Sequence, residues 1–288
     1  MRNFLRYKLC ELFGIPLYLD VSLIFLLVFF VMGGDFHRGF ICAALLLVSI
    51  TAHELGHALT AQAFGYRTRD ITLSLLGGCA SIIALPRKAH EEFLTAIAGP
   101  LVSFLLGALG AVGVVLLASG GTYLDALLMV VSDSLGVFGL DVAWGNGIFV
   151  ERGNISPFLP VFLYFSSMNF ILGIFNLLPG FPLDGGRIFR SAMRQFMSRI
   201  RATYIAMVVG RVVAVGIGCL GVYRIYIGLN WGFVTVLIAW MIWKEGYREY
   251  QLARLESGWD FADYRARASA PPYGGAGSES EVTRSERE

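Results

Sequence analysis

Long apolar stretches separated by short polar segments dominate the chain. A helix needs about 20 apolar residues to cross the hydrocarbon core of a membrane, within a range of roughly 17–25. Five stretches reach this length, and a shorter sixth has apolar flanks that would extend it. The predicted spans are Ile15–Gly33, Phe40–Phe64, Phe93–Ala118, Pro157–Leu178, Ala202–Tyr226 and Trp231–Trp243. The pattern therefore predicts an all-α polytopic membrane protein with six transmembrane helices.

Between the second and third predicted spans, the helical pattern gives way to alternation. Ile71, Leu73 and Leu75 alternate with other residues, Gly77-Gly78 follow, and a second short run ends at Ala84. Alternation around a glycine pair is typical of a β-hairpin. We expect a small membrane-associated β-hairpin here. One interpretation is that its open edge adds a substrate as an extra strand. The other is that it only plugs the helix bundle.

Two segments fall outside the predicted helices. Residues 119–156 contain an apolar piece too short to cross a membrane once, so we expect this segment to lie on the surface or to dip in and return. Residues 257–288 are rich in Gly, Ser, Glu and Arg and hold few large apolar residues, which predicts a disordered cytoplasmic tail. The predicted organisation is one membrane domain over residues 1–256, followed by this tail.

Composition agrees with a membrane location. The chain is 56% hydrophobic and 15% charged, with a mean hydropathy of +0.64, which excludes an ordinary soluble domain. A formal net charge of +2 is too small to indicate a nucleic-acid partner. The four cysteines form no C-x-x-C pair and indicate neither a disulfide framework nor a set of metal ligands.

Lysine and arginine gather in alternate connecting segments, and this asymmetry predicts the orientation. With the N-terminus in the cytoplasm, the inner segments hold Arg2, Arg6, Lys8, Arg67, Arg69, Arg87, Lys88, Arg187, Arg190, Arg194, Arg199, Arg201 and the tail from Lys244. The outer loops hold only Arg38 and Arg152, beside Asp35, Asp125, Asp133, Asp141 and Glu151. We expect a multi-pass protein of the plasma (inner) membrane with both termini in the cytoplasm.

The second predicted span contains the sequence His53-Glu54-Leu55-Gly56-His57, at the end of the uncharged run Phe40–Ala52. Residues four apart lie on one face of a helix, so His53 and His57 can bind one zinc ion together. Glu54 is turned partly off that face, where it can act as a general base. Ionisable groups at membrane depth are costly, which makes a functional role the default interpretation.

A catalytic zinc ion usually has three protein ligands and one open position, so the two histidines require a partner. Asp184 is the favoured candidate, because two prolines and three glycines around it cannot continue a helix. Broken backbone at membrane depth is tolerated where protein buries it or water reaches it. The alternatives are His90, more simply explained as a solvated histidine at a helix start, and His37, on the opposite side. A span-ending turn with an incidental aspartate is also possible.

Four segments, in this order, resemble the site-2 protease family of intramembrane zinc metalloproteases (peptidase family M50). They are His53–Ala61, Leu76–Gly78, Ala98–Pro100 and Asn176–Arg187. The short N-terminus and the predicted six spans are similar to the branch that includes the sporulation-factor-processing protease. The chain departs from the family in having no PDZ-sized insertion and no room for a CBS domain. It also has Ser103 where the family often has asparagine.

The resemblance implies one Zn²⁺ per chain bound by His53, His57 and Asp184, with Glu54 as the base and Asn176 as a substrate-binding residue. The implied activity is regulated intramembrane proteolysis, whose substrate is a transmembrane or membrane-associated regulatory protein in the lipid bilayer. The alternative from another class is an intramembrane metal transporter or sensor, which has no need for a base beside its first ligand. A third hypothesis is an inactive relative that binds helices without cutting them.

Overall fold

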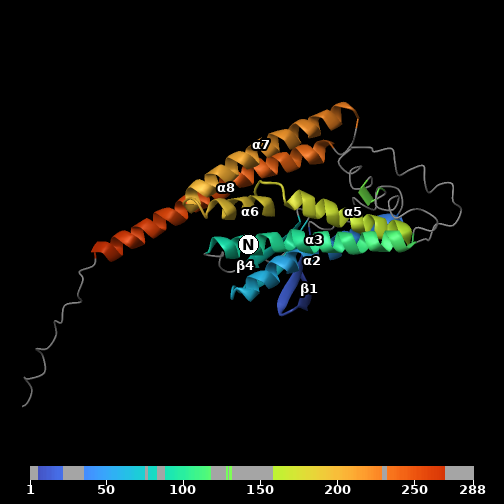
Figure 1. Cartoon of the computed structure of the whole chain (residues 1–288), viewed down its shortest axis with the longest axis horizontal. Helices are drawn as coiled ribbons and strands as arrows, with labels where there is room; N and C mark the ends of the chain where they lie inside the picture. Colours follow the sequence, from blue (N-terminus) through green and yellow to red (C-terminus); the bar gives the residue numbers. More distant parts are fainter. Residues whose placement is uncertain are drawn as a thin grey trace, which may run out of the picture.

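The computed structural model describes residues 6–21, 36–74, 77–82, 88–117, 128, 130–131, 158–228 and 232–269. Most of these residues are helical, and a small sheet lies beside the helices (Figure 1). The elements in chain order are β1 (Arg6–Leu12), β2 (Ile15–Asp20), α2 (Phe36–Ala63), β3 (Thr68–Ser74), β4 (Gly77–Ile82), α3 (Ala89–Leu117), α5 (Leu159–Asn176), α6 (Asp184–Met193), α7 (Arg199–Tyr226) and α8 (Gly232–Ser269).

Within the described residues, four helices are long and apolar enough to cross a membrane, where the sequence predicted six. They are Gly39–Ala63, Ala89–Leu117, Leu159–Asn176 and Arg199–Tyr226. The predicted first span is wrong at its start, because Ile15–Asp20 form strand β2. The sequence signal was the alternation of Ile15, Leu17 and Leu19 with Pro16, Tyr18 and Asp20, and in the structure Ile15 and Leu17 are buried. The rest of that span, residues 22–33, lies outside the described residues, as does most of the segment 119–156.

Most of the predicted sixth span and the first part of the predicted tail belong to one helix. Helix α8 contains Trp231–Trp243 except its first residue, and continues through Lys244 to Ser269. Its apolar part before Lys244 is too short to span a bilayer without its flanks. The helix also runs past residue 257, where the sequence predicted disorder to begin, and only residues 270–288 of the predicted tail lie outside the described part.

The predicted hairpin exists as β3 and β4, but it belongs to a four-stranded sheet in the order β1-β2-β3-β4. β2 pairs with β3 in parallel, with Leu17 opposite Ile71, and the other two pairs are antiparallel. β3 is therefore an inner strand, and β4 is an edge. Ile71 and Leu73 pack with Ile50 and Ala58 of α2, so the sheet lies along α2 beside the histidine motif.

The helices α7 and α8 lie side by side and form a hairpin next to the remaining helices (Figure 1). The loop between α5 and α6 packs against this hairpin through glycines. A Cβ on Gly180 would lie 3.3 Å from Cα of Gly210 on α7 and 2.9 Å from Ile242 on α8. Only glycine permits such a close approach of two backbones. The α7–α8 hairpin thus holds the loop that leads to Asp184.

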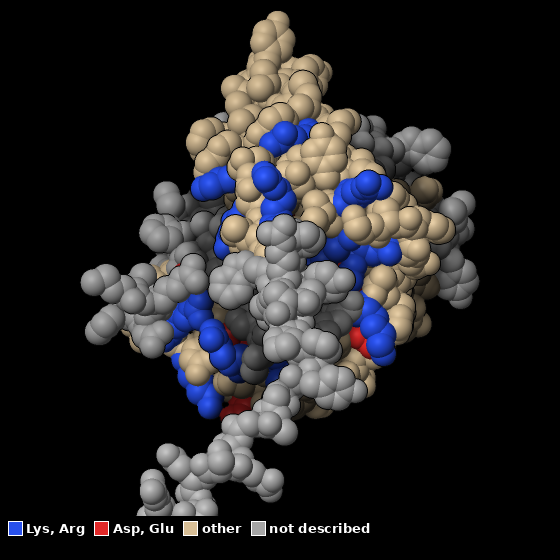
Figure 2. Space-filling model, turned by 90° about the vertical axis from the view of Figure 1, so that its left-hand side faces the viewer, with Lys and Arg blue, Asp and Glu red and all other residues tan. Residues whose placement is uncertain are grey.

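Lysine and arginine side chains gather on one end of the molecule (Figure 2). This end carries the C-terminal end of α6, the start of α7 and the charged half of α8 (Figure 1). It is the end that the sequence assigns to the cytoplasm.

Candidate metal centre

Three potential metal ligands converge although they are far apart in the sequence. His53 and His57 lie one turn apart on α2, and Asp184 is the first residue of α6. Nε2 of His53 and Nε2 of His57 each lie 3.0 Å from Oδ2 of Asp184, and the two Nε2 atoms are 3.2 Å apart. All three residues are buried. The structure therefore brings together the two histidines and the favoured third residue of the sequence analysis.

The position of Asp184 is set by the start of α6. The two following residues, Gly185 and Gly186, leave no space for a side chain: a Cβ on Gly185 would lie 2.3 Å from the carbonyl oxygens of Leu177 and Leu178. The first turn of α6 therefore rests directly on the end of α5. The helix N-terminus also favours a carboxylate at this place, because its free N–H groups and the helix dipole are positive there.

Both imidazole rings are held from behind by α3. Nδ1 of His57 lies 2.7 Å from the carbonyl oxygen of Thr95. A carbonyl oxygen can only accept, so this Nδ1 carries the hydrogen, and the Nε2 of a neutral His57 has a lone pair. Nδ1 of His53 lies 2.9 Å from the buried hydroxyl of Ser103, which can accept in the same way. These contacts orient both Nε2 atoms toward Asp184, as in metal sites whose histidines are fixed by a second hydrogen bond.

Gly99 of α3 faces the same centre. A Cβ at this position would lie 2.2 Å from Nε2 of His57 and 2.7 Å from Nε2 of His53, closer than real Cβ contacts come. A side chain here would occupy the space in front of both nitrogen atoms. The absence of a Cβ at Gly99 therefore leaves a cradle between α2, α3 and α6.

The donor set fits zinc. Tetrahedral zinc binds nitrogen and oxygen at about 2.0–2.1 Å, which places its ligand atoms roughly 3.3 Å apart. The three atoms here are 3.0, 3.0 and 3.2 Å apart. Two lone pairs and a carboxylate oxygen that point at one another repel, and a cation between them removes the repulsion. Two imidazoles and one carboxylate are also the ligand types of catalytic zinc sites.

The electrostatics agree with an ionised Asp184. Burial on its own would raise the pKa of the Asp184 carboxyl, but when His57 is protonated, its charge and the hydrogen bonds from both histidines lower this pKa below its ordinary value. The carboxylate is thus an acceptor or a ligand at neutral pH.

The other residues singled out in the sequence lie as follows. Glu54 is partly buried and follows His53 on α2. Asn176 is the last residue of α5, and its Nδ2 donates to the carbonyl oxygen of Leu172 in the same helix. His90 is 62% exposed at the start of α3, which matches its interpretation as a solvated histidine. The side chain of His37 lies outside the described residues.

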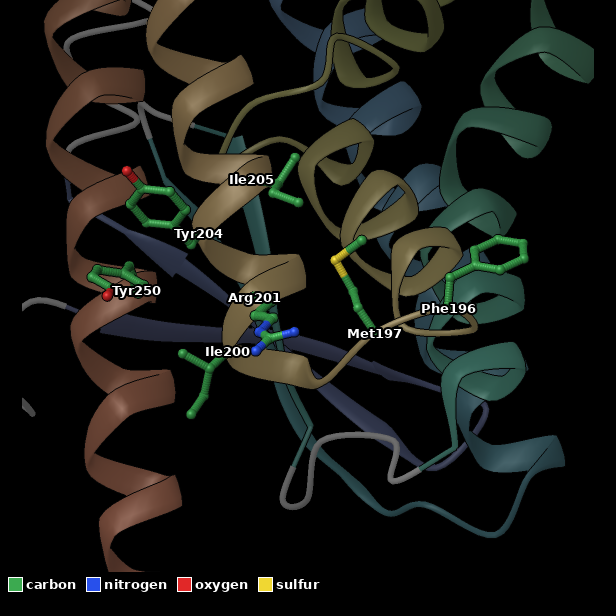
Figure 3. A pocket seen from close by; sticks show the side chains of 7 residues that line it. All are labelled: Phe196, Met197, Ile200, Arg201, Tyr204, Ile205 and Tyr250. Atoms are coloured by element: carbon green, nitrogen blue, oxygen red, sulfur yellow. The ribbon is translucent and has the colours of Figure 1, made fainter.

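An open pocket of about 560 Å³ lies between the start of α7 and α8, at the basic end. Figure 3 shows its lining, where Tyr204 and Tyr250 stand edge to face with ring centres 5.5 Å apart. Its lining residues include no His, Cys, Asp or Glu. The pocket therefore offers neither a metal ligand nor a catalytic carboxylate, and the chemistry belongs to the buried centre.

Comparisons with known proteins agree with this geometry. Residues 41–217, more than half of the chain, match peptidase family M50, and the chain belongs to this family. The fold resembles that of a site-2 protease from Methanocaldococcus jannaschii, with a TM-score of 0.53 at 27% identity over 85% of this chain and 95% of that one.

Curated relatives are named as zinc metalloproteases. One from Methanocaldococcus jannaschii is 27% identical over 87% of this chain, and one from Synechocystis, named a putative zinc metalloprotease, is 34% identical over 81%. The putative zinc metalloprotease Rip3 of Mycobacterium tuberculosis is 32% identical over 72%. The chain spans 62%, 56% and 45% of the length of these relatives.

Three residues of this centre were not assigned a role from the sequence. In the sequence, the Ala98-Gly99-Pro100 segment is only a point of similarity with the family and Ser103 a point of difference. Thr95 gives no signal, because it acts through its backbone carbonyl. A glycine and a serine four residues apart lie on one face of a helix. That spacing could have placed Gly99 and Ser103 together on the face of α3 that meets the two histidines.

Proposed function

We propose that this chain is an intramembrane zinc metalloprotease that cleaves a transmembrane or membrane-associated regulatory protein. The observation that carries the proposal is the convergence of His53, His57 and Asp184, two of them on a helix able to span a membrane. The M50 family and the names of the relatives support zinc as the ion.

His53, His57 and Asp184 would hold one zinc ion per chain. When bound, zinc supplies a Lewis acid that polarises a peptide carbonyl and makes water acidic enough to lose a proton near neutral pH. The chain's own contribution is to fix the three donors. The carbonyl of Thr95 sets the tautomer of His57, Thr95 and Ser103 hold the two ring planes, and the start of α6 sets the carboxylate.

Glu54 is proposed as the general base. Its carboxylate would take a proton from the attacking water and return it to the leaving amine. Ile50, Glu54 and Ala58 are each four residues apart and therefore lie on one stripe of α2. Ile50 and Ala58 contact the sheet, so this stripe faces the strands. Glu54 thus lies toward the side of α2 from which an extended peptide on the sheet would approach.

The sheet supports the way in which a substrate would be presented. A transmembrane helix hides its carbonyls in internal hydrogen bonds, so the substrate must be extended locally before cleavage. β4 is an edge of the sheet and also contacts α2. We propose that a substrate segment pairs with this edge by strand addition. Asn176 is proposed to stabilise the substrate from the end of α5.

The basic end supports the proposed orientation. The charged half of α8 and the start of α7 carry clusters of Lys and Arg (Figure 2), which favours a cytoplasmic location for this end in the plasma membrane. Both termini would then lie in the cytoplasm.

The test is cleavage of a candidate single-span substrate in proteoliposomes, with Glu54→Gln as the matched control. This change keeps the size of the side chain and removes the proton acceptor, so zinc should stay bound while cleavage falls by roughly 10²–10⁴. Cleavage by the variant at the wild-type rate would contradict the role of Glu54. If neither protein cleaves but both carry metal ions across the vesicle membrane, the transporter hypothesis replaces the protease.

A further inference from the structure

A buried cluster of charged residues joins three helices close to the metal centre. Arg190 of α6 is 2% exposed in its side chain, and Glu92 of α3 is 4% exposed. Nε of Arg190 donates to Oε1 of Glu92 at 2.8 Å, and its Nη2 lies 2.6 Å from the same oxygen. The other oxygen of Glu92 accepts from Arg194, also on α6. From the sequence alone, both arginines indicate only a cytoplasmic segment.

The third member of the cluster comes from α8. Nη1 of Arg190 donates to Oε2 of Glu249 at 2.8 Å. The guanidinium also lies 4.9 Å from the ring centre of Phe181, in the loop that leads to Asp184. Burial on its own would lower the pKa of Arg190, but Glu92 and Glu249 raise it above its ordinary value, so the guanidinium stays charged. One cation thus joins α3, α6, α8 and the loop before the metal centre.

The residues of this cluster lie on the helices that position the groups of the metal centre. α6 begins at Asp184 and is only ten residues long, so a rigid α6 transmits the position of Arg190 to the carboxylate. Glu92 lies three residues before Thr95, whose carbonyl holds His57. A buried ion pair often adds little stability over an apolar pair, because desolvation offsets the attraction. Its directional hydrogen bonds, in contrast, fix the relative positions of the helices.

We propose that Arg190 is a positioning residue for Asp184, and that α8 controls the metal centre through the contact of Glu249 with Arg190. The proposal rests on the zinc site proposed above. In this arrangement Glu249 of α8 holds Nη1 of Arg190, while Glu92 of α3 holds Nε and Nη2. A movement of α8 that withdraws Glu249 releases one side of α6 and loosens the third metal ligand.

A second glutamate on α8 provides a control for substitutions of Glu249. Glu256 lies about two turns beyond Glu249 on α8 and pairs at 2.8 Å with Arg199 of α7, with both side chains partly exposed. The variants Glu249→Gln and Glu256→Gln each remove one carboxylate charge from the same helix. Only the first acts on α6. Removing Arg190 itself would leave Glu92 buried with one partner fewer and endanger folding. The two glutamate variants therefore test the proposal better than a substitution of Arg190.

The experiment measures metal affinity by chelator competition in the full chain and the visible absorption of the Co²⁺-substituted protein. Glu249→Gln should weaken metal binding by about tenfold, the lower end of the effect of groups that orient metal ligands, and should shift the cobalt bands. Glu256→Gln should match the wild type in both. Equal affinity and identical bands in all three proteins would overturn the proposal, as would equal weakening in both variants, which would indicate a general effect of charge.

Hydrogen exchange of α6 in metal-free protein separates this proposal from the proposed function. Glu249→Gln should speed exchange in α6, and Glu256→Gln should not. If the wild type binds no metal but this difference in exchange persists, the zinc site is wrong and the coupling of α8 to α6 stands. If the wild type binds zinc and exchange in α6 is the same in all three proteins, the coupling is wrong and the zinc site stands.

Discussion

Replacing Gly99 by alanine tests the geometry of the metal centre with the smallest possible change. The added Cβ would lie 2.2 Å from Nε2 and 2.5 Å from Cε1 of His57, and 2.7 Å from Nε2 of His53. Comfortable contacts between such atoms need about 3.5–4.0 Å, so the rings must move by roughly 1 Å or more. Neither ring can move freely, because Thr95 and Ser103 hold their Nδ1 atoms.

The expected loss of zinc affinity follows from the cost of this overlap. Inserting one methyl group into a packed site costs about 1–3 kcal/mol. Because the overlap at Gly99 is large, we expect a cost at the upper end of this range. Each 1.4 kcal/mol is about a factor of ten in a binding constant. If the displacement falls on the metal ligands, Gly99→Ala should weaken zinc binding by about 10²-fold in a chelator competition assay, and cleavage should fall with zinc occupancy.

The control is Gly107→Ala in the same helix. A Cβ there would lie 3.1 Å from the ring of Phe170, which needs to give only by a few tenths of an ångström. We expect this variant to bind zinc like the wild type. If Gly99→Ala also binds zinc with wild-type affinity, the arrangement of α3 against the two histidines is wrong.

Three further predictions concern single contacts. Ser103→Ala removes the partner of a ligand histidine and should lower zinc affinity by about 10–100-fold, whereas Ser103→Thr keeps the hydroxyl and should lose less. Asn169→Leu removes a hydrogen bond of 2.9 Å between α5 and a serine of α2. Unfolding should show a loss of about 0.6 kcal/mol, typical of such bonds in membranes, with zinc affinity unchanged; a large loss of zinc would give Asn169 a role at the site. In β4, adjacent residues direct their N–H groups alternately toward β3 and outward. Of the variants Ala80→Pro and Ser81→Pro, the one that removes an outward N–H group should lose cleavage of a transmembrane substrate. The same variant should retain zinc and still cleave a short extended peptide. If both variants cleave the transmembrane substrate at the wild-type rate, the sheet only plugs the helix bundle.

The grouping of His53, His57 and Asp184 could be expected from the sequence because the signals that point to it are local. The four-residue spacing of His53 and His57 places them on one helical face whatever surrounds them. The segment Pro179–Pro182 before Asp184 ends a helix wherever such a sequence occurs, whereas Gly185 and Gly186 after it begin α6. The structure adds the reason why this broken segment is tolerated, since the loop is packed against Gly210 and Ile242 of the α7–α8 hairpin.

The sheet was predicted only in part because strand pairing is not local. The alternation at Ile71 and Leu73 was enough to predict a hairpin. The parallel partner β2 comes from before α2, and its apolar residues were absorbed into a predicted helix that starts at Ile15. That error left β3 as a free edge, where the structure has an inner strand.

The support of the metal centre could not be predicted because it depends on which helices meet. Nothing in the sequence near Arg190 indicates that it is buried between Glu92 and Glu249, residues about 100 and 60 positions away. In the sequence it is one of several arginines at the end of a span, and the positive-inside pattern accounts for it fully.

X-ray absorption at the zinc edge of the purified protein would identify the atoms that bind the ion. We expect one zinc per chain with two imidazole nitrogens and carboxylate or water oxygens as near neighbours at about 2.0–2.2 Å. In Asp184→Ala the two imidazole contributions should remain while occupancy falls. A sulfur neighbour, a spectrum and occupancy unchanged by Asp184→Ala, or protein that takes up no zinc would contradict the assignment of His53, His57 and Asp184 as the metal centre.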